Sequence, residues 1–307
     1  MRQVLFTIPI FGGIKIFGYG VMLVFAFFGS TGLAAWRARR EKLDPELFYD
    51  MAVWVYLGGL VGARLFYVIQ YWGDRVRTIG DAFRVWEGGI VLYGSIIGGT
   101  LAFFLYRFAR PFPVRPFLDV IAPALALGIA LGRLGCFLNG CCYGDRCDLP
   151  WAVSFPKGSP PWLQQVHDGQ IVKPNGSPPW VDYYDRLRHR TVQASEWSQP
   201  LHPTQLYSAI DGLVLLGLLS AYFPLRRRDG EVMALLMLTY PITRFLIEYL
   251  RNDEGAVLAG LTISQTISVL LFLGAVAFWS YLSRLPATRY AEGHQGVMPQ
   301  AAATAWH

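Results

Sequence analysis

The sequence contains few charged residues for its length. Only 16% of its 307 residues are Asp, Glu, Lys or Arg, whereas 53% are hydrophobic. Water-soluble globular domains carry about one quarter charged residues, and disordered chains carry even less apolar surface than such domains. The shortage of charge therefore argues against both classes and indicates a protein that lies within a membrane.

The excess of basic residues is also small, which bears on the partners of the chain. The formal net charge is +6, and most of the excess lies in short clusters between apolar segments. Attraction to anionic lipid headgroups explains such clusters more simply than nucleic-acid binding does. We therefore expect the lipid bilayer to be a partner and nucleic acid not to be one.

Cysteine is scarce, and its spacing excludes two common motifs. The four cysteines are Cys136, Cys141, Cys142 and Cys147. They form no C-x-x-C pair, as a quinone-linked thiol oxidoreductase would favour, and their gaps differ from those of zinc knuckles. The sequence thus predicts no metal site and no cofactor. Two alternatives stay open, namely a disulfide joining Cys147 to Cys141 or Cys142, and simple packing.

What the sequence does contain is a series of long apolar stretches, each near the roughly 20 residues that a helix needs to cross a bilayer. Backbone groups inside lipid must be satisfied locally, so these stretches are interpreted as helices. No internal duplication is visible, which disfavours a transporter built from inverted repeats. The sequence predicts an all-α integral membrane protein with about seven transmembrane helices, at residues 14–36, 47–72, 88–106, 117–138, 204–224, 231–250 and 259–283.

Basic clusters between these stretches predict the orientation of the chain in the membrane. Arginine and lysine accumulate on the cytoplasmic side of membrane proteins. Alternate connections carry such clusters, at 37–42, 107–115, 226–228 and 284–289. The loop 73–87 also holds three arginines, but the four other clusters outnumber it. We therefore expect the N-terminus outside and the C-terminus in the cytoplasm.

Two segments lie outside the predicted helices. The outward excursion 145–203, between the fourth and fifth helices, repeats GSPPW at 158–162 and 176–180. The sequence favours an ordinary proline-stiffened loop here, although it could also lie at the membrane interface or hold an extended peptide. Residues 286–307 lack apolar periodicity and are predicted to be a disordered cytoplasmic tail. Residues 1–285 would then form one transmembrane domain.

Charged residues within membrane helices are costly and therefore mark candidate functional positions. Arg244 and Glu248 could merely neutralise each other, and Arg64 and Arg133 could extend to the interface. Alternatively, the three arginines, all predicted in the outer half of their helices, bind an anion such as a lipid phosphate. The charged positions are Arg64, Arg133, Asp211, Arg244 and Glu248.

Six sequence motifs together resemble the prolipoprotein diacylglyceryl transferases of bacterial inner membranes. Each motif is weak alone, but they occur in register from residue 18 to residue 254 and touch nearly every predicted helix. They read GYGVM (18–22), GARLFYVIQY (62–71), WEGGIVLYGSIIGG (86–99), GRLGCFLNGCCYG (132–144), LHPTQLYSAIDG (201–212) and YPITRFLIEYLRNDE (240–254).

The resemblance implies a reaction in which phosphatidylglycerol gives its diacylglyceryl group to the thiol of the lipobox cysteine of a prolipoprotein. A thioether forms and glycerol 1-phosphate leaves. The implied partners are phosphatidylglycerol, the prolipoprotein signal peptide and the lipid bilayer, with no cofactor. The implied location is the bacterial inner membrane, with the active site towards the periplasmic side.

The resemblance also implies roles for individual residues. Arg133 matches the arginine that binds phosphatidylglycerol, and Arg244 matches a second essential arginine. His202 begins the histidine-proline motif, for which a structural or gating role is favoured over catalysis. Other family positions are occupied by Tyr19, Asn139, Gly144, Tyr240 and Glu248, and Arg64 and Tyr67 lie at the same predicted depth and complete the expected phosphatidylglycerol site.

Three positions depart from the pattern of many family members. Tyr93 stands where many carry a histidine, and a tyrosine with its ordinary pKa near ~10 is a poor base at neutral pH. Tyr93 could still orient the phosphate, so the catalytic set is expected to be Arg133, Arg244, Glu248 and Tyr93. The proton acceptor stays open between Glu248, another carboxylate and water. Cys136 and Cys141 stand where many members have asparagine and glutamate.

Overall fold

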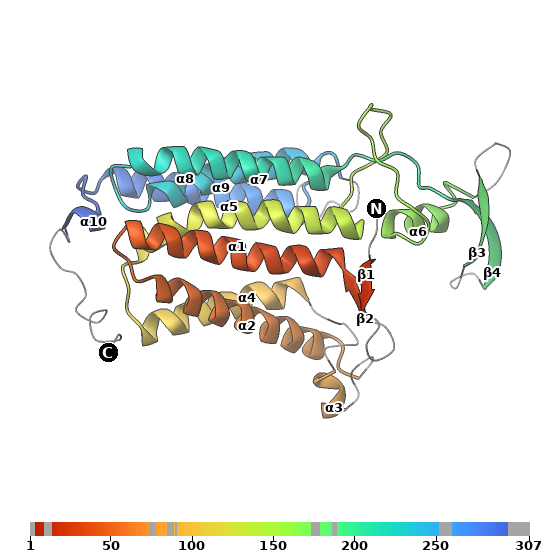
Figure 1. Cartoon of the computed structure of the whole chain (residues 1–307), viewed down its shortest axis with the longest axis horizontal. Coiled ribbons are helices and arrows are strands. Elements are labelled where there is room, and N and C mark those ends of the chain that lie inside the picture. The colour runs from red at the N-terminus through yellow and green to blue at the C-terminus, as the bar shows by residue number, and fades with distance from the viewer. Residues whose placement is uncertain are drawn as a thin grey trace. The chain divides into compact units, whose positions relative to one another are not determined.

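The computed structural model consists mainly of long helices (Figure 1). It describes residues 4–8, 14–73, 76, 78–84, 89, 91–172, 179–185, 189–251 and 260–293. Within these residues, every predicted apolar stretch overlaps a helix of at least 18 residues. These helices are α1 (Gly18–Arg40), α2 (Pro45–Gln70), α4 (Leu92–Ala109), α5 (Val114–Asn139), α7 (Thr204–Tyr222), α8 (Glu231–Glu248) and α9 (Ile263–Ser283).

Five of these helices, α1, α2, α5, α7 and α9, are long and apolar enough to cross a membrane, and α4 adds a shorter apolar helix. The prediction of a helical membrane protein is therefore confirmed. The exact number of spans and their direction stay predictions.

The helix starts follow from local sequence. Asp44 precedes α2 and accepts a hydrogen bond from the Glu46 amide at 3.0 Å, with a proline at the first helical position. Thr262 and Gln265 form a reciprocal capping box at the start of α9. Such caps satisfy amide groups that have no partner within the helix itself.

The predicted start of the first helix at residue 14 is wrong. Residues Ile14–Phe17 form strand β2, which pairs antiparallel with β1 (Val4–Ile8), and α1 begins only at Gly18. The stretch is apolar enough for a helix, but its β-branched isoleucines also suit a strand, and the preceding strand supplies hydrogen-bond partners. Hydropathy alone does not distinguish the two.

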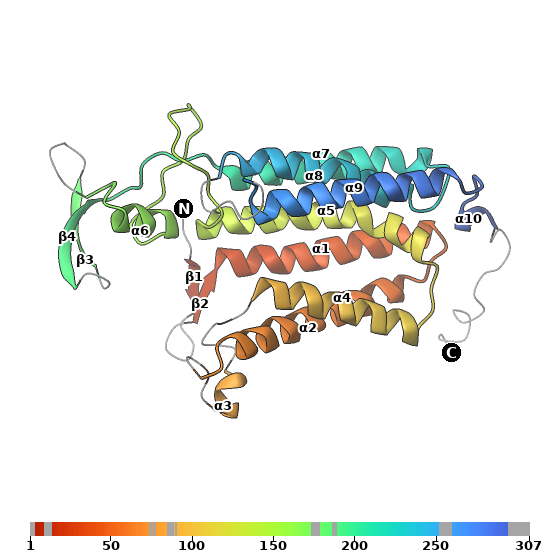
Figure 2. The same cartoon turned by 180° about the vertical axis from the view of Figure 1, so that it is seen from behind.

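The structure divides into two compact units, one formed by residues 1–30 and 121–287 and the other by residues 31–120 and 288–307. In the first unit, α8 packs against both α7 and α9, as both views show (Figures 1 and 2). Gly212 of α7 lies against α5, because a Cβ there would be 2.9 Å from the amide nitrogen of Ala130. The first unit is thus a packing of helices in which Gly212 permits a close contact between α7 and α5.

In the second unit, α2 and α4 pack with their backbones in contact. Gly58 and Gly62 on α2 face Gly94 and Gly98 on α4, and a Cβ on Gly62 would lie 2.3 Å from the Gly94 carbonyl oxygen. Small residues four apart permit this approach between membrane helices, where association depends on close packing. The connection between the two helices contains α3 (Ile79–Ala82).

Most of the excursion 145–203 is folded, so the prediction of an ordinary loop is wrong. It contains α6 (Pro160–His167) and an antiparallel hairpin of β3 (Trp180–Asp185) and β4 (Arg190–Ser195), all in the first unit. Trp162 is fully buried, and its indole donates a 2.6 Å hydrogen bond to the Ser195 carbonyl. The buried core of this small module comprises Trp162, Val166, Ile171, Val192 and Ala194.

Two shorter helical segments complete the described chain. A 3-10 turn, η2 (Phe223–Leu225), follows α7. Tyr290–Gly293 form α10, so part of the predicted tail is helical, and residues 294–307 lie outside the described residues.

We expect the substitution Gly62→Ala to lower the thermal stability of the purified protein. The added methyl would meet backbone atoms of α4, which cannot give way as a flexible side chain would, and such overpacking costs about 1–3 kcal/mol. Gly217→Ala is the matched control, because that helical glycine has no neighbour within 4 Å. Equal midpoints in a thermal unfolding assay in detergent would contradict the proposed backbone contact.

Candidate functional site

A buried carboxylate lies between two arginines at the end of α8. Glu248 is only 2% exposed and forms an ion pair with Arg244, one helical turn earlier. The Arg251 guanidinium lies 3.9 Å from the same carboxylate oxygen, and the Thr262 hydroxyl donates to the other oxygen at 3.4 Å. Arg244 also donates to the Ser264 hydroxyl at 2.9 Å. The two arginines are therefore held in place from α8 and from the start of α9.

Tyr240 precedes Arg244 on the same face of α8, as the i, i+4 spacing predicts. Between them, the Thr243 hydroxyl donates to the Asp211 carboxylate of α7 at 2.9 Å. The charged residue Asp211 is therefore satisfied by a contact between two helices, which supports a packing role for it.

Arg133 lies in the last two turns of α5, close to Tyr19 of α1. Tyr19 interacts electrostatically with the Arg133 guanidinium and with the thiols of Cys136, Cys141 and Cys142. Gly135 permits this approach, because a Cβ there would be 3.2 Å from the Tyr19 ring. The structure thus brings two residues of the expected phosphatidylglycerol site together.

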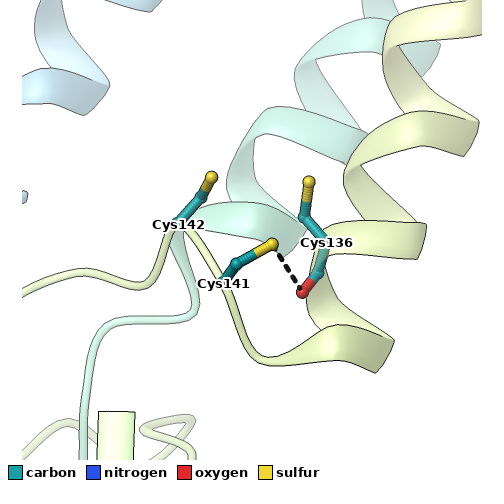
Figure 3. A group of neighbouring side chains, drawn as sticks. All are labelled: Cys136, Cys141 and Cys142. Carbon is teal, nitrogen blue, oxygen red and sulfur yellow. Dashed lines mark hydrogen bonds between the residues drawn. The ribbon is translucent and has the colours of Figure 1, made fainter. Parts of the chain in front are cut away.

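Three of the four cysteines form one group at the end of α5. The sulfur atoms of Cys136, Cys141 and Cys142 lie within 4.8 Å of one another. Cys136 comes from the helix and the other two from the loop that follows, and the Cys141 thiol donates to the Cys136 carbonyl at 3.7 Å (Figure 3). All four cysteines are described and free, and Cys147 is buried. The predicted disulfide alternative is therefore wrong.

The environment of Cys142 favours its thiolate. A hydrogen bond from the Cys136 thiol, together with the positive charges of Arg133 and Arg251, lowers the pKa of the Cys142 thiol below its usual range. The loop that carries Cys142 also contacts the residue before Arg251, because the Asp145 amide donates to the Leu250 carbonyl at 2.8 Å just after α8. The ends of these two helices therefore converge.

The loop after α5 is fixed by buried side chains at the start of α7. Gly140 reverses the chain with a φ of +78°, and Cys142 itself has a φ of +57°, which is rare for a residue with a side chain. The Thr204 hydroxyl donates to the Cys142 carbonyl and the Gln205 amide donates to the Cys141 carbonyl, both at 2.8 Å. These bonds hold the two thiols over the helix end.

Gly144 lies where the loop crosses two other segments. A Cβ at this position would be 2.6 Å from both the His202 Cβ and the Leu250 carbonyl oxygen, so a larger residue does not fit. The next amide, that of Asp145, donates to the Leu250 carbonyl at 2.8 Å. Gly144 therefore permits the contact between this loop and the end of α8, and its expected role in substrate binding stays a prediction.

His202 precedes α7 and belongs to a small polar group. Its Nδ1 lies 3.3 Å from the Tyr207 hydroxyl, which also accepts a 2.8 Å hydrogen bond from the Trp151 indole. Its carbonyl accepts from the Gly144 amide at 2.9 Å. These contacts fit the structural role expected for His202, which stays a prediction.

Arg64 belongs to the second unit. Its guanidinium donates to the carbonyl oxygens of Gly89, Asp81 and Arg84 at 2.9, 2.6 and 3.1 Å, and lies 5.1 Å from the centre of the Tyr67 ring. Arg64 thus organises the connection between α2 and α4. Its expected role in binding phosphatidylglycerol stays a prediction, as does that of Tyr67. The side chain of Tyr93 lies outside the described residues.

Sequence reasoning missed three residues of this site. Arg251 follows Glu248 at i+3, and this spacing could have revealed it. Thr204 and Gln205 carry no such signal, because their partners lie about 60 residues away in the sequence. The Gln205 side-chain oxygen is buried and has no hydrogen-bond partner within the described part of the chain, so a bound donor there would recover about 1–3 kcal/mol.

Comparison with known proteins gives consistent matches. The family model described as prolipoprotein diacylglyceryl transferase matches residues 3–281. Three similar proteins are called phosphatidylglycerol–prolipoprotein diacylglyceryl transferase. The one from Synechococcus elongatus is 32% identical over 89% of this chain and 84% of its own length, and the one from Clostridium tetani is 30% identical over 91% and 97%. The one from Rhodopirellula baltica is 42% identical over 52% of this chain, which covers 34% of that longer protein.

We expect Glu248→Gln to destabilise the protein strongly. The change leaves two arginines without their buried carboxylate, and breaking a buried ion pair costs about 3–5 kcal/mol. Glu292→Gln is the control, because Glu292 pairs with Arg289 at the exposed surface, where such pairs contribute little. The unfolding midpoints of both variants are measured by thermal unfolding in detergent. Equal midpoints would contradict the contribution of the buried Glu248 ion pair to stability.

Proposed function

The chain belongs to the prolipoprotein diacylglyceryl transferase family, which carries out the first step of lipoprotein maturation, and we propose that Arg133 and Arg244 bind its lipid substrate. The donor in this proposal is phosphatidylglycerol and the acceptor is the lipobox thiol of a prolipoprotein. The observation that carries the proposal is the meeting of the ends of α5 and α8: the Asp145 amide after α5 donates to the Leu250 carbonyl after α8, close to the Arg244–Glu248 ion pair.

The chemistry requires positive charge at one place. The acceptor sulfur attacks the glycerol carbon that bears the phosphate, a carbon–sulfur bond forms, and the carbon–oxygen bond to the phosphate breaks. Negative charge develops on the departing glycerol 1-phosphate. Preorganised guanidinium groups in a site with little water stabilise such charge without reorganising during the reaction.

We assign the first contact with the phosphate to Arg133, with Tyr19 and Asn139 beside it. Arg133 lies near the end of α5, and Tyr19 interacts with it electrostatically. Tyr240 and Arg244 share a face of α8, and we assign the second contact with the phosphate to Arg244, which shares the Glu248 carboxylate with Arg251. Guanidinium groups suit this task because their planar donors match phosphate oxygens in pairs.

Glu248 acts in this proposal as a positioning residue. Its two oxygens already accept from Arg244 and from Thr262, and Arg251 lies beside it. A carboxylate engaged in this way orients Arg244 and is poorly placed to take the thiol proton. We propose instead that the field of the arginines favours the acceptor thiolate, and that the proton passes to water.

We further propose that the site faces the outer side of a bacterial cytoplasmic membrane. The arginine cluster at 37–40 ends α1, whereas the thiol group ends α5, and the basic residues 226–228 follow α7. The concentration of basic residues at the other ends of these helices supports this orientation.

We expect Arg133→Gln and Arg244→Gln each to reduce diacylglyceryl transfer by about 100-fold or more, the usual effect of removing one donor to a developing oxyanion. The measurement is transfer from phosphatidylglycerol to a model prolipoprotein in membranes, followed by mass spectrometry of the added group. Arg289→Gln is the matched control, because its partner Glu292 is exposed. Full activity of either site variant, in protein that is inserted normally, would contradict its role.

The orientation has its own test. Alkaline phosphatase folds only where disulfides form, so a fusion after Gly169 should be active and a fusion after Arg228 inactive. The reverse pattern would place the excursion 145–203 in the cytoplasm and contradict the proposed orientation.

A further inference from the structure

The three thiols at the end of α5 have the geometry of a ligand group. Their sulfur atoms lie within 4.8 Å of one another, and the side chains of Cys136, Cys141 and Cys142 gather around one small space (Figure 3). A metal ion about 2.3 Å from each of three sulfurs requires sulfur separations of about 4 Å. The three sulfurs therefore exceed this separation by less than about 1 Å, although the spacing along the sequence resembles no zinc motif.

The backbone holds the group in place before any ligand binds. Cys142 has a left-handed backbone with a φ of +57°, which is unfavourable for a residue with a side chain. Its carbonyl accepts from Thr204 and the Cys141 carbonyl accepts from Gln205, and these two donor residues are only 1% and 0% exposed. A buried scaffold thus maintains an unfavourable conformation that directs the thiols towards Cys136.

The number and softness of the donors select the kind of ion. Thiolates favour Cu(I), zinc and iron–sulfur clusters. Zinc in structural sites and iron–sulfur clusters normally use four protein ligands. Within the described residues, the group contains three cysteines and no histidine or carboxylate as a fourth member. We propose that Cys136, Cys141 and Cys142 bind one Cu(I) ion in a three-coordinate site.

The charges around the group suit such an ion. Three thiolates and one monovalent cation leave the site negative, and two arginines flank it: Arg133 lies one turn before Cys136 on α5, and Arg251 follows Leu250, whose carbonyl accepts from the Asp145 amide of the same loop at 2.8 Å. A metal-loaded group would therefore attract Arg133 away from a bound phosphate. This consequence rests on the proposed function, and it implies that Cu(I) lowers transferase activity.

The experiment measures binding first and activity second. Purified full-length protein in detergent is titrated with Cu(I) under reducing conditions against a chromophoric Cu(I) chelator. The wild type should retain one Cu(I) per chain, with three sulfur neighbours at about 2.3 Å in X-ray absorption spectra. Cys142→Ser should weaken Cu(I) binding by at least about 100-fold. Loss of a residue that only hydrogen-bonds to a metal ligand typically has a smaller effect.

Cys147→Ser is the matched control, because Cys147 lies outside the group, and it should bind Cu(I) as the wild type does. Equal affinity of the wild type and Cys142→Ser, or four ligands around the bound ion, would overturn the proposed site. Thermal unfolding of each variant separates loss of binding from loss of folding. If the metal-free protein transfers the diacylglyceryl group and added Cu(I) leaves that activity unchanged, only the proposed inhibition is overturned. If the metal-free protein shows no transfer, the result counts against the proposed function.

Discussion

The ion pair between Arg244 and Glu248 is the contact on which the site depends. A charge in the interior of a membrane protein is costly unless it is paired, and the cost rises when a carboxylate is almost completely buried. Glu248 reduces this cost by accepting from Thr262 and by lying beside Arg251. The same contacts join the end of α8 to the start of α9. One buried carboxylate therefore fixes two positive groups and two helix ends.

The loop after α5 extends this arrangement to Arg133. Its amide at Asp145 donates to the Leu250 carbonyl, two residues beyond Glu248, and Gly144 leaves room for the crossing. The first turn of α7 supplies the remaining contacts through Thr204 and Gln205. The site is thus assembled from four helix ends, those of α5, α7, α8 and α9, whose positions depend on one another, although each helix forms from its own apolar sequence.

The difference between helices that form locally and a site that depends on contacts between helix ends explains what the sequence could predict. The long helices were predictable because membrane helices need only local apolar residues and satisfy their own backbone groups. They are α1, α2, α4, α5, α7, α8 and α9. The pair Arg244 and Glu248 was predictable from its spacing of four residues. The strand at 14–17 was missed because its pairing partner is another segment.

The module built on α6 was missed for the same reason. Trp162 packs on residues of β4, about 30 residues further along the chain, and proline-rich sequence between them gives no periodic signal. For the cysteines, the sequence predicted no ligand group, whereas the structure brings three thiols together. Their spacing along the sequence argues against a ligand group. However, the chain turns after the end of α5, with Cys142 in a left-handed conformation, and this turn places the thiols of Cys141 and Cys142 near that of Cys136. Contacts that depend on a turn of the backbone cannot be read from spacing.

The thiols near Arg133 are side chains whose charge depends on their protonation and on metal binding. By the resemblance drawn from the sequence, many relatives carry glutamate where this chain has Cys141, so in those proteins a carboxylate contributes a permanent negative charge at this point. A thiol contributes negative charge only when it loses its proton or binds a metal ion. The replacement therefore exchanges a fixed electrostatic partner of the site for a conditional one. Under the proposed role of Arg133, the protonation or metal binding of the three neighbouring thiols would therefore change the positive charge that this arginine offers to a lipid phosphate.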